Sequence, residues 1–182
     1  VSIVRNLGPS TVDGNPSMLR PGVDQGLFCS GFHNLWYITD GSEAGTRPVV
    51  SGAQPVADCG GSADGGYFDG HFYFHAAFAL QTYALWRSDG STDGVSHFYD
   101  LPAEEGETPL MTDFLAGDQV FYFEITTSGS QTTRELWRSD GTSQGTWAVL
   151  DITETLMELV VVAGQDLIFR DAESGHWWRS NG

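Results

Sequence analysis

Histidine and aspartate side chains lie together in one stretch of the sequence, at a spacing that suits a metal site. His71 and His75 flank Tyr73 in an aromatic run, and Asp69 precedes them. Residues two apart along a β-strand share a face, so these side chains are expected to point the same way. Two imidazoles on one face can bind a shared metal ion. The sequence indicates no third ligand beyond Asp69, so we favour structural histidines and predict no metal site.

Acidic residues, or an amide in their place, recur immediately before glycine. The positions are Asp40, Asp89, Asp140 and Asn181. Carboxylate oxygens bind Ca²⁺, but one turn supplies too few of them and the chain has no Asp-x-Asp-x-Asp loop. Asp and Asn before Gly also suit tight turns, because both tolerate a positive φ and their side chains bond the nearby backbone. We therefore predict structural turns, no cofactor and at most weak Ca²⁺ binding.

Enzyme motifs give little support for catalysis. The chain has no phosphate-binding loop and no His-Glu-x-x-His motif. Acids are abundant, so the neighbours Glu104 and Glu105 do not by themselves indicate a glycosidase pair. We predict no catalytic residues.

The composition narrows the class of partner. The chain carries 24 acidic residues against 8 basic ones, a net charge of −16, which makes nucleic acid and anionic membranes poor partners. This acidity fits a salty or Ca²⁺-containing medium, or a genome that favours arginine over lysine. No apolar run is long enough for a transmembrane segment. Two cysteines, Cys29 and Cys59, leave both a disulfide and two buried thiols open.

One unit of about fifty residues is repeated four times. Leu85–Gly90 and Leu136–Gly141 both read Leu-Trp-Arg-Ser-Asp-Gly, Trp177–Gly182 is a close copy, and Trp36–Gly41 is a weaker one. Successive motif glycines are 49, 51 and 41 residues apart. The repeats cover approximately residues 1–46, 47–95, 96–146 and 147–182, and together they predict one domain over 1–182.

Each repeat reads as four short strands. The third shows a hairpin over 110–115 and 120–125, then the motif strand, then a strand near 147–150. The longest link follows the fourth strand, as between the blades of a propeller. We predict an all-β fold, a four-bladed β-propeller of four-stranded antiparallel blades. Val1–Leu7 resembles the fourth strands and is expected to close the last blade, which carries Trp178.

Aromatic residues hold one register of the motif in every repeat. They are Tyr37, Trp86, Trp137 and Trp178. A residue kept at one register meets the same environment each time, so we predict packing between blades. The alternative is a lectin-like surface that stacks on sugar rings. The next residues, Arg87, Arg138 and Arg179, face the other way and are expected to pair with acids at the blade edges.

One register of the second strands is polar in every repeat but chemically different each time. Its members are Ser30, His75, Glu124 and Arg170. Structural positions usually repeat one residue type. The divergence is compatible with a composite ligand-binding pocket, and also with solvent-exposed positions near a loop. These four are the predicted ligand-binding residues if such a pocket exists.

The motif resembles the bacterial Glu-Leu-Trp-x-x-Asp-Gly-Thr repeat family. Glu135–Thr142 matches it fully, whereas Ala84 and His176 replace the Glu, and Tyr37 replaces the Trp. The resemblance covers the whole chain and implies a propeller-like fold in an exported or surface-attached bacterial protein. It implies no catalytic residues.

These features together predict a secreted or cell-surface, non-catalytic binding module for a glycan or protein partner. A rigid ring whose loops vary freely suits recognition. The alternative is a structural subunit or fragment of a larger extracellular repeat assembly with many subunits. A hydrolase or lyase acting on polysaccharide is less favoured. The expected location is extracellular, cell-surface or periplasmic.

Overall fold

The computed structural model describes most of the chain. The described residues are 16–21, 24–30, 35–51, 54–55, 65–78, 82–91, 93–104, 106–154 and 157–182. They form strands and turns and contain no helix, so none could cross a membrane as a helix. The chain divides into two compact units, Val1–Asp100 and Leu101–Gly182.

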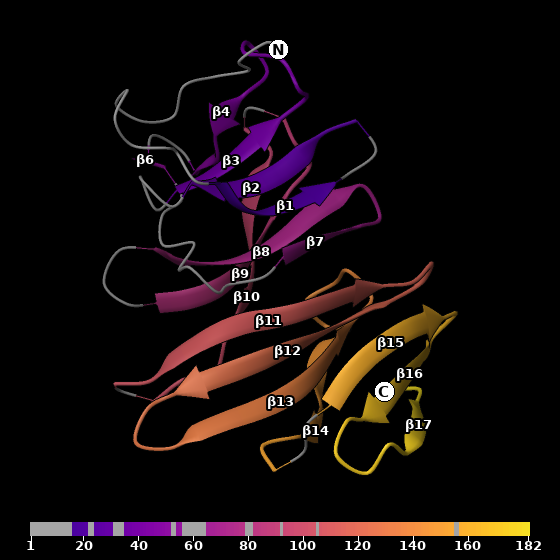
Figure 1. Cartoon of the computed structure of the whole chain (residues 1–182). Helices are drawn as coiled ribbons and strands as arrows, with labels where there is room; N and C mark the ends of the chain where they lie inside the picture. Colours follow the sequence, from indigo (N-terminus) through magenta and orange to yellow (C-terminus); the bar gives the residue numbers. More distant parts are fainter. Residues whose placement is uncertain are drawn as a thin grey trace. The chain divides into compact units, whose positions relative to one another are not determined.

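The first unit holds two four-stranded antiparallel sheets (Figure 1). The first sheet contains β1 (Pro16–Pro21), β2 (Gly26–Ser30), β3 (Leu35–Thr39) and β4 (Arg47–Pro48). The second contains β7 (Gly65–Phe68), β8 (His71–Phe78), β9 (Thr82–Ser88) and β10 (Val95–Asp100). A short hairpin of β5 (Val50–Ser51) and β6 (Gln54–Pro55) follows β4.

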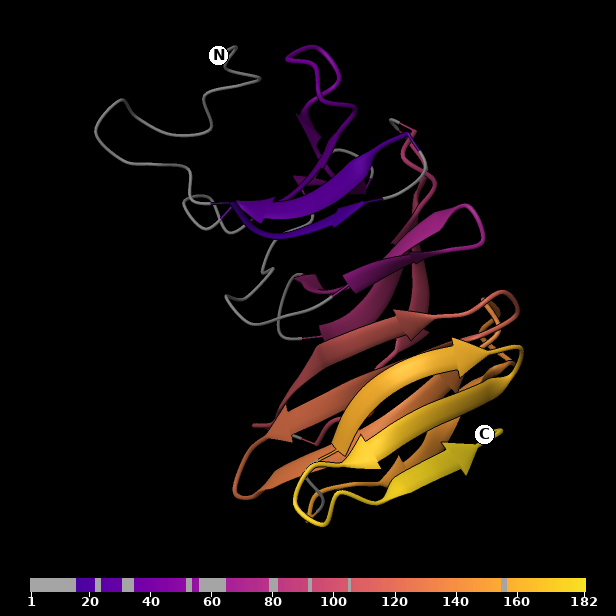
Figure 2. The ribbon, with the colours of Figure 1, turned by 45° about the vertical axis from the view of Figure 1, so that its right-hand side comes forward.

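The second unit holds a four-stranded sheet and a three-stranded one (Figure 2). The larger contains β11 (Thr108–Ala116), β12 (Phe121–Ser128), β13 (Thr132–Ser139) and β14 (Thr146–Asp151). The smaller, yellow in Figure 2, contains β15 (Met157–Ala163), β16 (Asp166–Asp171) and β17 (Trp177–Ser180). Consecutive strands are neighbours in every sheet.

The prediction of an all-β fold is confirmed: the described residues form four antiparallel sheets of three or four strands and one short hairpin. The strand predicted to complete the last sheet, Val1–Leu7, lies outside the described residues. Among those described, β17 pairs with β16 and has no second neighbour.

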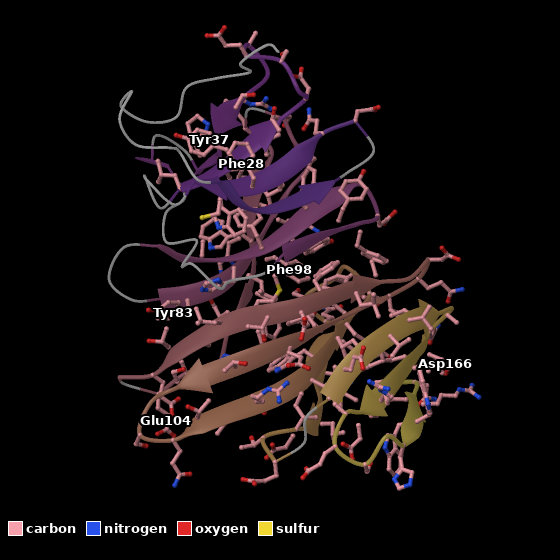
Figure 3. All side chains as sticks on the ribbon, viewed as in Figure 1. Phe28, Tyr37, Tyr83, Phe98, Glu104 and Asp166 are labelled. Atoms are coloured by element: carbon pink, nitrogen blue, oxygen red, sulfur yellow. The ribbon has the colours of Figure 1, made fainter. Side chains whose placement is uncertain are left out.

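The core of the first unit lies between its two sheets. Leu27, Trp36 and Ile38 from the first sheet pack with Phe74 and Trp86 from the second. The Trp36 ring lies 5.2 Å from the Phe74 ring, and its Nε1 donates a hydrogen bond to the His75 backbone oxygen at 3.1 Å. On the opposite face of the first sheet, Phe28 stacks on Tyr37 at 5.5 Å (Figure 3).

The core of the second unit lies between its own two sheets. Val120, Tyr122 and Leu136 from the first sheet pack with Val162 and Leu167 from the other. The Tyr122 hydroxyl donates to the backbone oxygen of Gln165 at 2.8 Å. Each unit therefore buries apolar side chains between a pair of consecutive repeats.

Candidate functional site

The motif turns are built from the same hydrogen bonds each time. Asp40, Asp89 and Asp140 each accept a bond from the backbone amide two residues on, at 2.8–2.9 Å. The prediction that these carboxylates bond amides within their own turns is therefore confirmed. Hydrogen bonds from the hydroxyl and the amide of the residue two positions on hold the pKa of each aspartate below its usual value.

The motif glycine is required by the turn. At all four copies its φ lies between 80° and 90°, a region that glycine adopts without strain. Its amide donates to the Ser or Thr hydroxyl two residues earlier, at 3.0–3.2 Å. These equivalent bonds fix how the four repeats correspond, residue by residue.

The third motif turn also contains a Gly-x-Ser-x-Gly spacing, from Gly141 to Gly145. In α/β-hydrolases that spacing joins a strand to a helix and exposes the serine as a nucleophile. Here it joins β13 to β14, and Asp140 is bonded to both the amide and the hydroxyl of Thr142. The segment is a structural turn.

The aromatic register is buried in three repeats of four. Trp86 is 7% exposed, Trp137 4% and Tyr37 7%, as predicted. Trp178 is 54% exposed, so the prediction of burial is wrong there. The cause is the edge strand: His97 on β10 pairs with Trp86 and its ring contacts the indole at 5.6 Å, whereas no described strand lies beside β17.

The motif arginines have different partners. Arg179 pairs with Asp166 at 2.7 Å, as predicted (Asp166 is labelled in Figure 3). No described acid pairs with Arg138, which is buried, lies 4.6 Å from the Trp147 ring and donates to Gln165, so the prediction of an acid partner is wrong among the described residues. A cation stacked on indole needs no carboxylate to stabilise it. Arg87 donates to a serine hydroxyl at 3.3 Å.

The polar register needs one correction. His75, Glu124 and Arg170 each pair across the sheet with the residue before the motif aromatic. In the first repeat that place belongs to Cys29, not Ser30, because β3 pairs Tyr37 with Phe28 and so Trp36 with Cys29. Ser30 is therefore one position out of register.

The described members of this register contact different partners. Glu124 bonds Arg134 at 2.6 Å, and Arg170 bonds Glu158 at 2.7 Å. The His75 ring stacks on Tyr83 at 6.0 Å. A composite pocket of these residues stays a prediction.

Cys29 is disulfide-bonded, which decides between the two alternatives that the sequence left open. The chain's other cysteine, Cys59, lies outside the described residues. Among the residues described, no group of three or more His, Cys, Asp or Glu side chains is placed to hold a metal ion.

A cavity of about 170 Å³ in the first unit is the strongest candidate for a site. It is lined by Asp24, Gln25, Tyr67, Phe72 and Asp89. The two aspartates are exposed, whereas Phe72 is buried beneath them. The Oε1 atom of Gln25 is buried and has no hydrogen-bond partner. Unpaired buried acceptors are rare, so this oxygen suggests a place where a ligand donates.

The sequence did not single out this cavity. Asp24 and Gln25 lie in a turn before β2, and Asp89 lies in a motif turn more than sixty residues later. Only the pairing of repeats brings them together. A signal in the sequence could have indicated it. The third and fourth repeats have valine, Val120 and Val162, at the positions of Gln25 and Tyr67 in the first and second repeats.

Comparison with known proteins gives a likeness of fold. No protein-family model matches the chain, and no curated protein matches it. The crystal structure of the computationally designed Ika4 protein is similar, with a TM-score of 0.52 over 99% of this chain and 97% of that chain. The two chains share a fold. At 10% sequence identity the likeness extends no further.

Proposed function

We propose that this chain is a non-catalytic binding module of the cell exterior, which recognises a protein or glycan partner at the polar cavity of its first unit. The observation that carries this proposal is the cavity itself, with its exposed carboxylates and the unpaired oxygen of Gln25. Ligand sites combine an apolar floor with a few convergent polar groups, and Phe72 with Asp24 and Asp89 provides that combination.

The location at the cell exterior has separate support. Disulfides persist in oxidising compartments, and Cys29 is disulfide-bonded. A net charge of −16 favours solubility and steers basic partners toward the chain.

The finer fold belongs to the same proposal. We infer that the four sheets are the blades of a four-bladed propeller of the Glu-Leu-Trp-x-x-Asp-Gly-Thr repeat family, closed by Val1–Leu7 on β17. The support is the repeated motif turn, the three-stranded last sheet, and the exposure of Trp178 on β17, which has no outer neighbour among the described strands.

Closure predicts how β17 exchanges its amide hydrogens. Deleting residues 1–7 should speed exchange in Trp177–Ser180 by on the order of tenfold or more, because those amides would lose a neighbouring strand. Hydrogen exchange read by mass spectrometry measures this. Segment 146–151, on β14, is the internal control and should not change. Equal exchange of β17 in both chains would contradict closure.

The open edge of β17 also favours the alternative of a larger assembly. An edge that no described strand covers, with Trp177 and Trp178 exposed, can accept a strand from another chain. If protection of β17 rises with protein concentration and does not require residues 1–7, the edge is an assembly contact.

The binding proposal predicts a ligand whose capture depends on the cavity. The parent chain and the double variant Asp24→Gln/Asp89→Asn should be compared on a glycan array and on arrayed peptides of varied charge. Cross-strand pairing makes Gln119 and Asn181 the equivalents of Asp24 and Asp89 in the second unit, as derived in the next subsection. The variant copies these residues, so the fold is expected to persist. Binding by the parent that falls at least tenfold in the variant supports the proposal. Identical patterns from both proteins, or no binding by the parent, contradict it.

A further inference from the structure

The two units contain the same repeat-to-repeat interface built with different side chains. Thr39 and Ser139 each accept a bond from the amide of the motif glycine. Each also bonds the hydroxyl of the threonine seven residues later, Thr46 or Thr146. Cross-strand pairs with these residues make Gly26 equivalent to Phe121. Counting back from Gly26 and from Phe121, Asp24 therefore corresponds to Gln119, and Gln25 to Val120.

The opposite side of the interface is aligned in the same way. Ser88 and Ser180 each accept a bond from the motif glycine and pair with Phe72 and Leu167. Phe72 pairs with Tyr67 on β7, and Leu167 pairs with Val162 on β15, so Tyr67 is equivalent to Val162. Asp89 corresponds to Asn181.

These equivalences show what the cavity replaces. In the second unit, Val120, Val162 and Leu167 are buried in one apolar cluster. Beside them, Gln119 accepts a hydrogen bond from Gln165 at 3.2 Å. In the first unit the position of Gln165 is taken by Gly70, which has no side chain to offer. The first unit thus has a cavity with polar walls where the second has packed valines.

The charged and amide groups that line the cavity offer hydrogen-bond acceptors. Asp89 is held ionised, because its bonds to Ser91 lower its pKa. Asp24 adds a second carboxylate, and Gln25 contributes the unpaired Oε1. A side-chain carbon at Gly90 would collide with that Oε1, so the glycine leaves room for this oxygen, and the Gly90 carbonyl already accepts a hydrogen bond from Arg47. A ligand that complements this set donates several hydrogen bonds and carries positive charge.

We propose that this cavity binds a primary alkylammonium group, as presented by a lysine side chain on a protein partner. The inference rests on the proposed binding function and names its ligand. Three N–H donors match Asp24, Asp89 and Gln25, and the rings of Tyr67 and Phe72 contact the alkyl chain and the cation. The chain has no lysine, so none of its own side chains offers this group.

The size of the cavity favours a single side chain over a glycan. Pockets that hold drug-sized ligands measure about 300–1,000 Å³. At about 170 Å³, this one admits a group of side-chain size. The two carboxylates also attract a cation, and a neutral sugar offers no positive charge to them.

The test is an NMR titration of the ¹⁵N-labelled chain with Nα-acetyl-lysine methylamide. Saturable shifts at the amides of residues 24–26, 67–72 and 89–91 are expected, in the millimolar range for a probe this small. The Nε-acetylated probe, which lacks the charge, should bind at least tenfold more weakly. Gln25→Val, which copies Val120, should weaken binding severalfold, and Asp24→Gln/Asp89→Asn should weaken it at least tenfold.

Controls separate this inference from the broader proposal. Asp118→Asn/Asp140→Asn removes two charges that do not line the cavity and should leave the affinity unchanged. An equal loss in that control would show nonspecific attraction and overturn the inference. Equal binding of both lysine probes would overturn it, as would displacement of the probe by equimolar CaCl₂. If only monosaccharides shift the cavity amides, the ammonium inference fails and the binding function stands. If no probe does, both fail.

Discussion

Replacing Trp137 by alanine is expected to destabilise the chain by about 3–5 kcal/mol, the usual range for truncating a fully buried tryptophan. Trp137 is 4% exposed, stacks on Phe123 at 6.2 Å, and donates from Nε1 to Glu135. A domain of this size is stabilised by about 5–15 kcal/mol in total, so the loss is a large share of it. Urea unfolding followed by tryptophan fluorescence measures the change.

Trp177 provides the matched control, because it is the same residue type on the surface of the same unit. Trp177→Ala should change the free energy of unfolding by less than about 0.5 kcal/mol, as surface substitutions usually do. If Trp137→Ala melts like the parent and loses only partner binding, the aromatic register is a recognition surface.

Replacing Arg134 by methionine is expected to cost about 3 kcal/mol at pH 7. Glu124 is 1% exposed and its main compensation is the 2.6 Å ion pair with Arg134. Removing one partner of a buried pair costs about 3–5 kcal/mol, because the other charge is left in the interior. Since Arg134 is 24% exposed, we expect the lower end of that range.

The loss should depend on pH in a defined direction. Burial raises the pKa of Glu124 above its ordinary value of 4.5, and Arg134 opposes the rise. A raised folded pKa means that the folded state binds the proton more readily, so stability falls as pH rises from 4.5 through the folded pKa. Without Arg134 the pKa rises further. The deficit of Arg134→Met should therefore shrink as pH is lowered from 7.5 toward 4.5.

Two further variants make this result specific to the buried pair. Glu124→Leu/Arg134→Met should recover most of the stability, because apolar residues can replace a buried ion pair. Arg170→Met breaks the exposed pair with Glu158 and should cost less than about 1 kcal/mol at any pH. A deficit of Arg134→Met that stays constant with pH would show that lost packing, not the charge of Glu124, is the cause.

The sequence predicts features that each repeat determines locally. The motif turn depends on an aspartate and a glycine a few residues apart, and its hydrogen bonds appear as expected at Asp40, Asp89 and Asp140. Strand order follows from hairpin spacing, and the sheets confirm it. Burial of Trp178 failed because it depends on a neighbouring strand that is remote in sequence.

Two other features could not be predicted from the local sequence pattern. The polar pattern of the second strands predicts Ser30 in this register, whereas cross-strand pairing puts Cys29 there. A shift of one residue reverses the face of a strand, so small alignment errors have large effects. The cavity requires knowing which side chains of one repeat face those of the next, and which positions lack a filler, as Gly70 does.

The second glycine of the first three motif turns limits the substitutions that these repeats can accept. A side-chain carbon at Gly45, Gly94 or Gly145 would collide with the carboxylate of the aspartate five residues earlier. The two positions are therefore linked in time: the aspartate must change first, or move, before the glycine is free to change. A lineage that substitutes the glycine first crosses a less stable intermediate. The same pair is present in the first repeat, where Tyr37 stands at the position of the motif tryptophan.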